Sequence, residues 1–311
     1  MTRPERKRRR IQIPALGVRL LTLALVVPLY MSLIWMGDLI WVAVVVWSAM
    51  LACYEYFGLC RQGGYPTNHK FGMLWCAVLI IRFSGAFSGV PLSLVITWGM
   101  IVLLASALFS RRTPFLTWLT TASGPMYIGT CLALLVPIRQ ADSGFWWLVL
   151  LMWTTYMADS GAYFAGSLWG RHKLAPAISP RKSWEGLAGA LVAGPLMAMI
   201  IVLLSQHPGW LSIPQTLPDW PIARTDWFRN LTSLEAHYFE PLPINLWAGL
   251  GVGFLIAVLG QLGDLTISMW KRHVGTKDSG TLFRGHGGML DRIDSLLFTS
   301  PLIYSLILIL M

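Results

Sequence analysis

The chain has 311 residues, of which 55% are hydrophobic and 12% are charged, against about 25% charged in an ordinary globular protein. This composition, with a mean hydropathy of +0.60, excludes a disordered chain, a collagen-like rod and an ordinary cytosolic enzyme. It indicates an all-α, polytopic integral membrane protein, in which the net charge of +10 must be interpreted by position because Lys and Arg report orientation.

Long apolar runs predict about nine transmembrane helices, since a helix needs about 20 mostly apolar residues to span a bilayer. In chain order the expected spans are 15–36, 38–59, 71–89, 91–109, 115–137, 144–168, 187–205, 246–270 and 295–311. We therefore divide the chain into a basic tail over 1–14, N-terminal membrane helices over 15–137, and a C-terminal membrane region over 144–311 that carries the candidate site.

The positions of the basic residues predict which connections share a side of the membrane. If the tail is cytoplasmic, nine spans also place four connections in the cytoplasm, namely 60–70, 110–114, 169–186 and 271–294. Nineteen of the 24 Lys and Arg residues then lie inside and three lie outside, which is the bias that membrane proteins show. We expect a multi-pass protein of the cell (inner) membrane with its N-terminus and its site cytoplasmic, and with the connection 206–245 outside.

A stripe of polar and small residues occurs in the span 144–168 and continues just past it. Asp159, Tyr163, Gly166 and Gly170 are spaced to share one helical face. Glycines on that face would let another backbone approach closely. The stripe is explained either by a glycine-packed helix crossing with Asp159 hydrogen-bonded internally, or by a functional carboxylate.

A second stripe lies at the end of the span 246–270. Gln261, Asp264, Ser268 and Lys271 share one face and run toward the connection 271–294. Ionisable groups within membrane spans are costly and usually mark function. A structural ion pair of Asp264 with a basic residue is the alternative, but such a pair does not need the whole stripe.

The connection that follows has the densest polar pattern. It reads Lys277-Asp278-Ser279-Gly280, then Gly285-His286-Gly287-Gly288, then Asp291-Arg292-Ile293-Asp294-Ser295. One of the two aspartates could merely favour the start of a helix. Together, carboxylates that can hold Mg²⁺ and cations and glycine-rich turns that can bind phosphate suit phosphoryl or nucleotidyl transfer. The histidine is better explained as a phosphate contact than as a general base.

Two of these stretches resemble the signature of the phosphatidate cytidylyltransferases, also called CDP-diacylglycerol synthases. The C-terminal resemblance starts at Ser268 and continues through Lys271-Arg272, Lys277-Asp278-Ser279-Gly280, Gly285-His286-Gly287-Gly288 and Asp291-Arg292-Ile293-Asp294. The earlier one runs from Asp159-Ser160-Gly161-Ala162-Tyr163 to Ser179-Pro180-Arg181-Lys182-Ser183 and Glu185-Gly186. By motif, the resemblance covers about 159–295.

The resemblance implies a reaction and a set of site residues. Phosphatidate and CTP would give CDP-diacylglycerol and pyrophosphate, with Mg²⁺ and room for a second cation, in a homodimer that contacts membrane lipid and has no nucleic-acid partner. Asp264 and Asp291 would bind the metal and, with Lys271, form the catalytic set. The implied substrate-binding residues are Ser179, Lys182, Ser183, Glu185, Ser268, Arg272, Lys277, Asp278, His286, Gly287, Gly288, Arg292 and Asp294.

Two features depart from the family pattern. Arg284 stands where the family usually has proline, and the connection 206–245 is longer than expected. A paralogous transferase that uses another lipid phosphate or nucleotide therefore stays an alternative. An ion-coupled transporter is a second alternative, but it would place its charges near the midplane, whereas these cluster toward one face.

Overall fold

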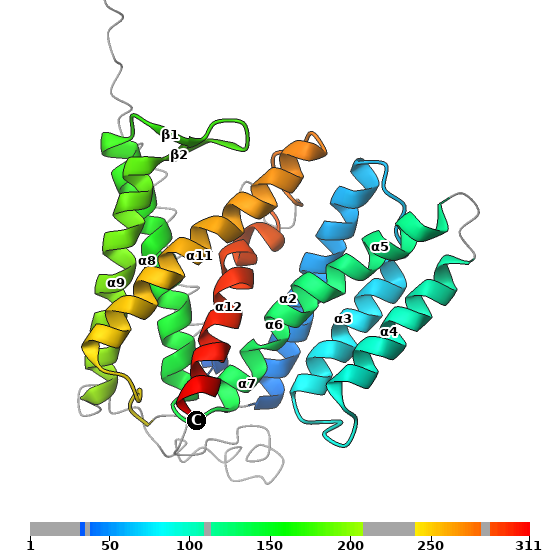
Figure 1. Ribbon diagram of the computed structural model, residues 1–311, viewed down its shortest axis with the longest axis horizontal. Helices are drawn as coiled ribbons and strands as arrows, with labels where there is room; N and C mark the ends of the chain where they lie inside the picture. Colours follow the sequence, from blue (N-terminus) through cyan, green and yellow to red (C-terminus); the bar gives the residue numbers. More distant parts are fainter. Residues whose placement is uncertain (1–31, 35–37, 109–112, 208–239, 281–286) are drawn as a thin grey trace, which may run out of the picture.

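The computed structural model describes residues 32–34, 38–108, 113–207, 240–280 and 287–311. Within these ranges the protein consists of packed helices and one two-stranded sheet (Figure 1). Several parts of the sequence interpretation lie outside the described residues: the tail 1–14, nearly all of the expected span 15–36, most of 206–245, and Arg284 and His286.

The N-terminal helices are α2 (Asp38–Gln62), α3 (His69–Phe83), α4 (Leu92–Ala107) and α5 (Pro114–Gly124). The helix of α5 continues through a π-helical turn, η1 (Pro125–Gly129), into α6 (Thr130–Ala133) and α7 (Leu135–Gln140). The remaining elements are α8 (Gly144–Trp169), β1 (Lys173–Ala175), β2 (Ser179–Ser183), α9 (Trp184–Gln206), α11 (Leu246–His273) and α12 (Leu290–Leu310).

A helical membrane protein is confirmed, but the expected count of about nine spans is not. Among the described residues, five helical segments are long and apolar enough to cross a membrane: Asp38–Gln62, Pro114–Gln140, Trp184–Gln206, Leu246–His273 and Leu290–Leu310. The expected spans 71–89 and 91–109 became α3 and α4, which have only 15 and 16 residues. At about 1.5 Å per residue they are shorter than a hydrocarbon core of about 30 Å.

The turn between α3 and α4 accounts for the shortness of these two helices. The chain leaves the helix after Phe83 and turns through residues 84–90, with Gly85 at a positive φ of 82°. Glycine adopts that conformation without steric cost. The sequence placed this break later, between 89 and 91, because Ala86, Phe87 and Val90 keep the segment partly apolar.

A β-hairpin within the connection 169–186 is a small addition to the predicted helical fold that the sequence did not indicate. Strands β1 and β2 pair antiparallel, with Lys173 opposite Ser183 and Ala175 opposite Ser179. These residues lack the alternation of apolar and polar side chains by which a strand is found from sequence. The hairpin is short and leads directly into α9.

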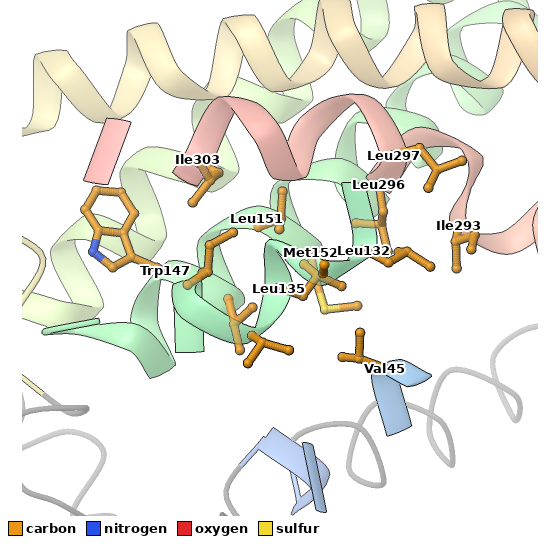
Figure 2. Packing of buried hydrophobic residues seen from close by; sticks show 14 of the residues in the cluster. Val45, Leu132, Leu135, Trp147, Leu151, Met152, Ile293, Leu296, Leu297 and Ile303 are labelled. Carbon is orange, nitrogen blue, oxygen red and sulfur yellow. The ribbon is translucent and has the colours of Figure 1, made fainter. Parts of the chain in front are cut away.

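The main buried core joins the N-terminal helices to the C-terminal ones. Figure 2 shows side chains of α2, α6, α7, α8 and α12 packed together, including Val45, Leu132, Leu135, Trp147, Leu151, Met152, Ile293, Leu296, Leu297 and Ile303. Trp147 and Leu151 are almost completely buried. Burial of such side chains is the main force that holds α12 against the N-terminal helices at this contact.

Glycines bring α8 and α9 into backbone contact. A Cβ atom on Gly161 would lie 2.6 Å from the carbonyl oxygen of Gly189, so neither position has room for a side chain. Nearer the hairpin, a Cβ atom on Gly166 would lie 3.2 Å from Ser183 Oγ. The expected close approach of a second backbone to the glycine stripe of 144–168 is therefore present, and the second backbone is α9.

Helix ends converge at one edge of the molecule. In Figure 1 the C-terminal ends of α2, α8 and α11 and the N-terminal ends of α9 and α12 all point toward the upper side of the view, where the hairpin also lies. α12 begins at Leu290, five residues earlier than the expected start at 295. Asp291 consequently lies in the first turn of α12, and Asp294 lies inside the helix.

Candidate active site

The polar face of α11 meets the hairpin through one lysine. Lys182 Nζ, from β2, lies 2.9 Å from Asp264 Oδ2 and donates a hydrogen bond to the carbonyl oxygen of Gln261 at 3.2 Å. Ser268 Oγ donates to the other oxygen, Asp264 Oδ1, at 3.1 Å. The Asp264 side chain stays about one third exposed, at 34%. The polar face that the spacing predicted on α11 is therefore partly covered by Lys182, and its Asp264 stays partly accessible.

A second lysine–aspartate pair links α11 to α12. Lys271 Nζ donates to Asp291 Oδ1 at 2.6 Å, and both side chains are only 11% exposed. Asp291 Oδ2 accepts the backbone N–H groups of Ser279 at 2.9 Å and Gly288 at 3.1 Å. One carboxylate therefore fixes a helix, a lysine and two points of the preceding connection.

The structure explains why position 287, next to this pair, is a glycine. Gly287 has φ = 82°, and a Cβ atom there would lie 2.7 Å from Asp291 Oδ2. Both the left-handed backbone and the close carboxylate exclude a side chain. His286 lies outside the described residues.

The hairpin side of the site is held by a helix cap and an arginine. Ser183 Oγ accepts from the N–H of Gly186 at 3.1 Å and so caps α9. Glu185 lies in the first turn of that helix, where a negative charge is favourable, and its carboxylate contacts His172 Nδ1 at 2.7 Å. Arg272 donates to the carbonyl oxygen of Ile178 at 3.2 Å, which ties the end of α11 to the hairpin.

The other expected site residues divide into exposed and buried groups. Lys277, Asp278 and Arg292 are exposed at this edge, and Ser179 is half-buried in β2. Asp294 is 8% exposed, and its Oδ1 accepts the N–H of Ser295 at 2.7 Å. The structure therefore brings Lys182, Asp264 and Ser268 into direct contact, and Lys271, Asp291 and Gly288 into a second contact group.

Asp159 is held internally by two other helices. Gln261 Nε2 donates to Asp159 Oδ1 at 2.8 Å, and Ser295 Oγ donates to Oδ2 at 3.4 Å. Of the two explanations that the sequence left open for this stripe, the structure thus provides the internal hydrogen bonding and the glycine-packed crossing. The contact also joins α8, α11 and α12. It is linked to the Lys182–Asp264 pair through Gln261, whose carbonyl oxygen accepts from Lys182.

Comparison with known proteins gives the family. Residues 17–310 match the model of the cytidylyltransferase family. The chain belongs to this family. A phosphatidate cytidylyltransferase of Bacillus subtilis is 29% identical over 299 residues, covering 93% of this chain and 96% of the relative. Phosphatidate cytidylyltransferases of Staphylococcus haemolyticus and Staphylococcus aureus are each 27% identical and cover 94% of this chain and 98% of the relative.

The donor set of this cytidylyltransferase fits Mg²⁺ held jointly with a substrate. Among the described residues, no group of three or more His, Cys, Asp or Glu side chains could hold a metal ion unaided. Mg²⁺ commonly takes only one or two carboxylates and completes its shell with phosphate oxygens and water. A carboxylate oxygen has two acceptor positions. Counting donors among the described residues only, Asp264 Oδ1, Asp264 Oδ2 and Asp291 Oδ1 each receive one, which leaves one acceptor position on each oxygen.

Sequence reasoning missed one polar residue of the cytidylyltransferase at this edge. Glu55 of α2 accepts hydrogen bonds from Ser279 Oγ and from the N–H groups of Met289 and Leu290. A signal for it was present, because a carboxylate within the apolar run 38–59 is expensive in a membrane span and indicates a role. Its partners lie more than two hundred positions away and could not be found from local spacing.

Proposed function

We propose that this protein is a membrane phosphatidate cytidylyltransferase, which converts phosphatidate and CTP to CDP-diacylglycerol and pyrophosphate. The family assignment and the names of the relatives support this reaction. The observation that carries the proposal is the polar face of α11, an otherwise apolar helix. Its Asp264 meets Lys182 of the hairpin, and its Lys271 meets Asp291 of α12.

The chemistry needs positive charge at such a place. An oxygen of the phosphatidate phosphate attacks the α-phosphorus of CTP, the bond from that phosphorus to the β-phosphate bridging oxygen breaks, and pyrophosphate leaves. Both reactants are anionic, so catalysis depends mainly on positioning and charge neutralisation. Lys182 and Lys271 each hold an ammonium group against a carboxylate at this edge, and in our proposal they contact phosphate oxygens during turnover.

The remaining roles follow the resemblance. Asp264 and Asp291 would hold Mg²⁺, which when bound would supply further positive charge against the triphosphate. We assign phosphate contacts to Ser179, Lys182, Ser183, Lys271, Arg272, Lys277 and Arg292. Asp278 and Asp294 would bind the nucleotide or hold the basic residues in place. The rest of the proposed substrate-binding set consists of Glu185, Ser268, His286, Gly287 and Gly288.

Placement in the membrane is part of the proposal. We propose that the edge with the hairpin faces the cytoplasm, together with the tail 1–14, because nineteen of 24 Lys and Arg residues would then be cytoplasmic. CTP would enter from that side, while phosphatidate would arrive from the inner leaflet. The enzyme would act as a homodimer in contact with membrane lipid, as the family resemblance implies.

Substrate selection by the purified protein tests the function. The protein, in lipid vesicles, is given Mg²⁺ and CTP labelled in the cytosine ring, with one lipid phosphate at a time: phosphatidate, lysophosphatidate or an isoprenoid-ether phosphate. We expect label in the organic phase with phosphatidate. Transfer to another lipid phosphate in preference to phosphatidate would contradict the proposed substrate. Absence of transfer to every lipid would contradict the reaction.

A further inference from the structure

The Glu55 carboxylate is buried and accepts three hydrogen bonds from the C-terminal part of the chain. Its residue is 7% exposed. Oε1 accepts the N–H of Met289 at 2.9 Å, and Oε2 accepts the N–H of Leu290 at 2.8 Å and the hydroxyl of Ser279 at 2.9 Å. Ser279 and Leu290 are 224 and 235 positions away in sequence. These bonds join α2 directly to the beginning of α12.

This contact supplies a helix cap that α12 does not provide for itself. The residue at the N-terminal boundary, Met289, makes no side-chain cap, whereas the first N–H groups of a helix lack partners within it. Glu55 satisfies two of them and places a carboxylate at the positive end of the helix, where it is favourable. Asp291, in the first turn of the same helix, accepts with its own carboxylate the N–H groups of Ser279 and Gly288.

Two glycines of the polar connection are explained by the same carboxylate. A Cβ atom on Gly280 would lie 2.6 Å from Glu55 Oε1, and one on Gly288 would overlap the Glu55 carboxylate. The backbone therefore approaches Glu55 closely on both sides. Ser279 is held twice, because its hydroxyl donates to Glu55 and its N–H donates to Asp291.

We propose that Glu55 is a positioning residue of the active site. It fixes Ser279 and the first turn of α12, and thereby holds Asp291 in place to bind Lys271. Within the described part of the chain, Glu55 makes no hydrogen bond or ion pair with Lys271 or Asp264; its effect is transmitted through the backbone of 279–280 and 288–291. Its predicted effect on turnover rests on the proposed function.

The variant Glu55→Gln tests this role at constant side-chain size. Met289 and Leu290 donate to different oxygens, so a glutamine must point its NH₂ group at one of these N–H groups. Displacement of reacting groups by about 1 Å can cost about 100-fold in rate. We expect kcat to fall by about 10- to 100-fold, while the KM for phosphatidate stays close to wild type. Ser279→Ala, which removes one bond and keeps the two backbone contacts, should lower kcat in the same direction but less.

Asp38→Asn provides a matched structural control on the same helix. Asp38 is the first residue of α2, whereas Glu55 lies in its C-terminal half, and Asp38 pairs with the buried Arg139 at 2.7 Å. If Glu55 were only a structural contact, both variants would lower the unfolding temperature and leave kcat per folded molecule unchanged. We expect Asp38→Asn alone to behave in that way.

Hydrogen exchange separates this inference from the proposed reaction. The N–H groups of Met289 and Leu290 should exchange faster in Glu55→Gln than in wild type, and should be unaffected in Asp38→Asn. Wild-type protein that fails to form CDP-diacylglycerol, together with this selective increase in exchange, would overturn the reaction but retain the positioning contact. Wild-type turnover with unchanged kcat and unchanged exchange in Glu55→Gln would overturn the role of Glu55 and leave the reaction intact.

Discussion

Lys182 is the hairpin residue whose side chain contacts Asp264 of α11, and its charge can be tested against a neighbour on the same hairpin. Lys182→Met keeps the length of the side chain but removes the ammonium group that contacts Asp264. Loss of one electrostatic contact to a transition state costs on the order of 100-fold in kcat. We expect a fall of that order for Lys182→Met. Lys173→Met, at an exposed position of β1, should retain activity near wild type.

Steady-state rates with saturating CTP and phosphatidate give both values. Equal losses in the two variants would show that total hairpin charge matters rather than the contact with Asp264. Unchanged turnover in Lys182→Met would remove Lys182 from the active set.

Asp264 can be tested through the metal dependence of turnover. Asp264→Asn keeps the size of the side chain but removes the negative charge, so Mg²⁺ should activate the variant only at higher concentration and kcat should fall on the order of 100-fold. Asp142→Asn, exposed in the turn before α8, is the matched control and should show the wild-type Mg²⁺ dependence. Mg²⁺ titration of the initial rate checks both. An Asp264→Asn variant with a wild-type titration curve would exclude Asp264 as a ligand.

Single residues were predictable where the pattern was local. The spacing of Asp264, Ser268 and Lys271 places them on one face of α11, and the structure has Ser268 bonded to Asp264. Which lysine meets which aspartate was not predictable, because Lys182 comes from a different element and Lys271 pairs across 20 positions. Glu55 was missed for the same reason: its burial is explained only when its partners are known.

At the scale of elements, the contact of α8 with α9 depends on the absence of side chains. Gly161→Ala would place a Cβ atom 2.6 Å from the carbonyl oxygen of Gly189, so the two helices must separate. Such overpacking costs about 1–3 kcal/mol. We expect a lower unfolding temperature for the purified protein, measured in detergent by intrinsic fluorescence.

Gly251→Ala in α11 is the control for this substitution. No atom lies within 4 Å of a Cβ atom at Gly251, and alanine favours a helix over glycine by about 1 kcal/mol. The unfolding temperature should therefore stay equal or rise. A Gly161→Ala variant as stable as Gly251→Ala would contradict the tight α8–α9 contact.

The elements themselves were only partly predictable. Apolar runs located all the described long helices, because burial in lipid requires such runs. They placed the break between α3 and α4 six residues too late, and they did not locate the hairpin or the start of α12 at Leu290. The turn depends on the backbone of Gly85, the hairpin on pairing of charged and polar residues, and the start of α12 on a carboxylate from α2.

At the scale of the whole molecule, the edge with the hairpin and the opposite edge, which carries the turn before α8, should face opposite sides of the membrane. A single cysteine at Arg171, beside the hairpin, should be protected from a membrane-impermeant thiol reagent in intact cells. A single cysteine at Asp142, in the turn before α8, should be labelled. The four native cysteines are first replaced by alanine or serine. Labelling at position 171 and protection at 142 would reverse the proposed orientation.

The family and the membrane character could be predicted from the whole chain, because composition and motif order do not require knowledge of the packing. The convergence of the ends of α2, α8 and α11 with the starts of α9 and α12 could not, since it results from long-range contacts. This convergence is what places Glu55, Lys182 and Asp291 around one end of α11.

Position-specific labelling of CTP tests the central claim most directly. Purified protein in vesicles with phosphatidate and Mg²⁺ receives CTP labelled either at the α-phosphorus or at the γ-phosphorus. Cytidylyl transfer predicts that the α-label enters the lipid and that an equal amount of γ-label appears as pyrophosphate. Gamma-label in the lipid, or release of labelled inorganic phosphate without labelled lipid, would contradict a cytidylyltransferase mechanism for this protein.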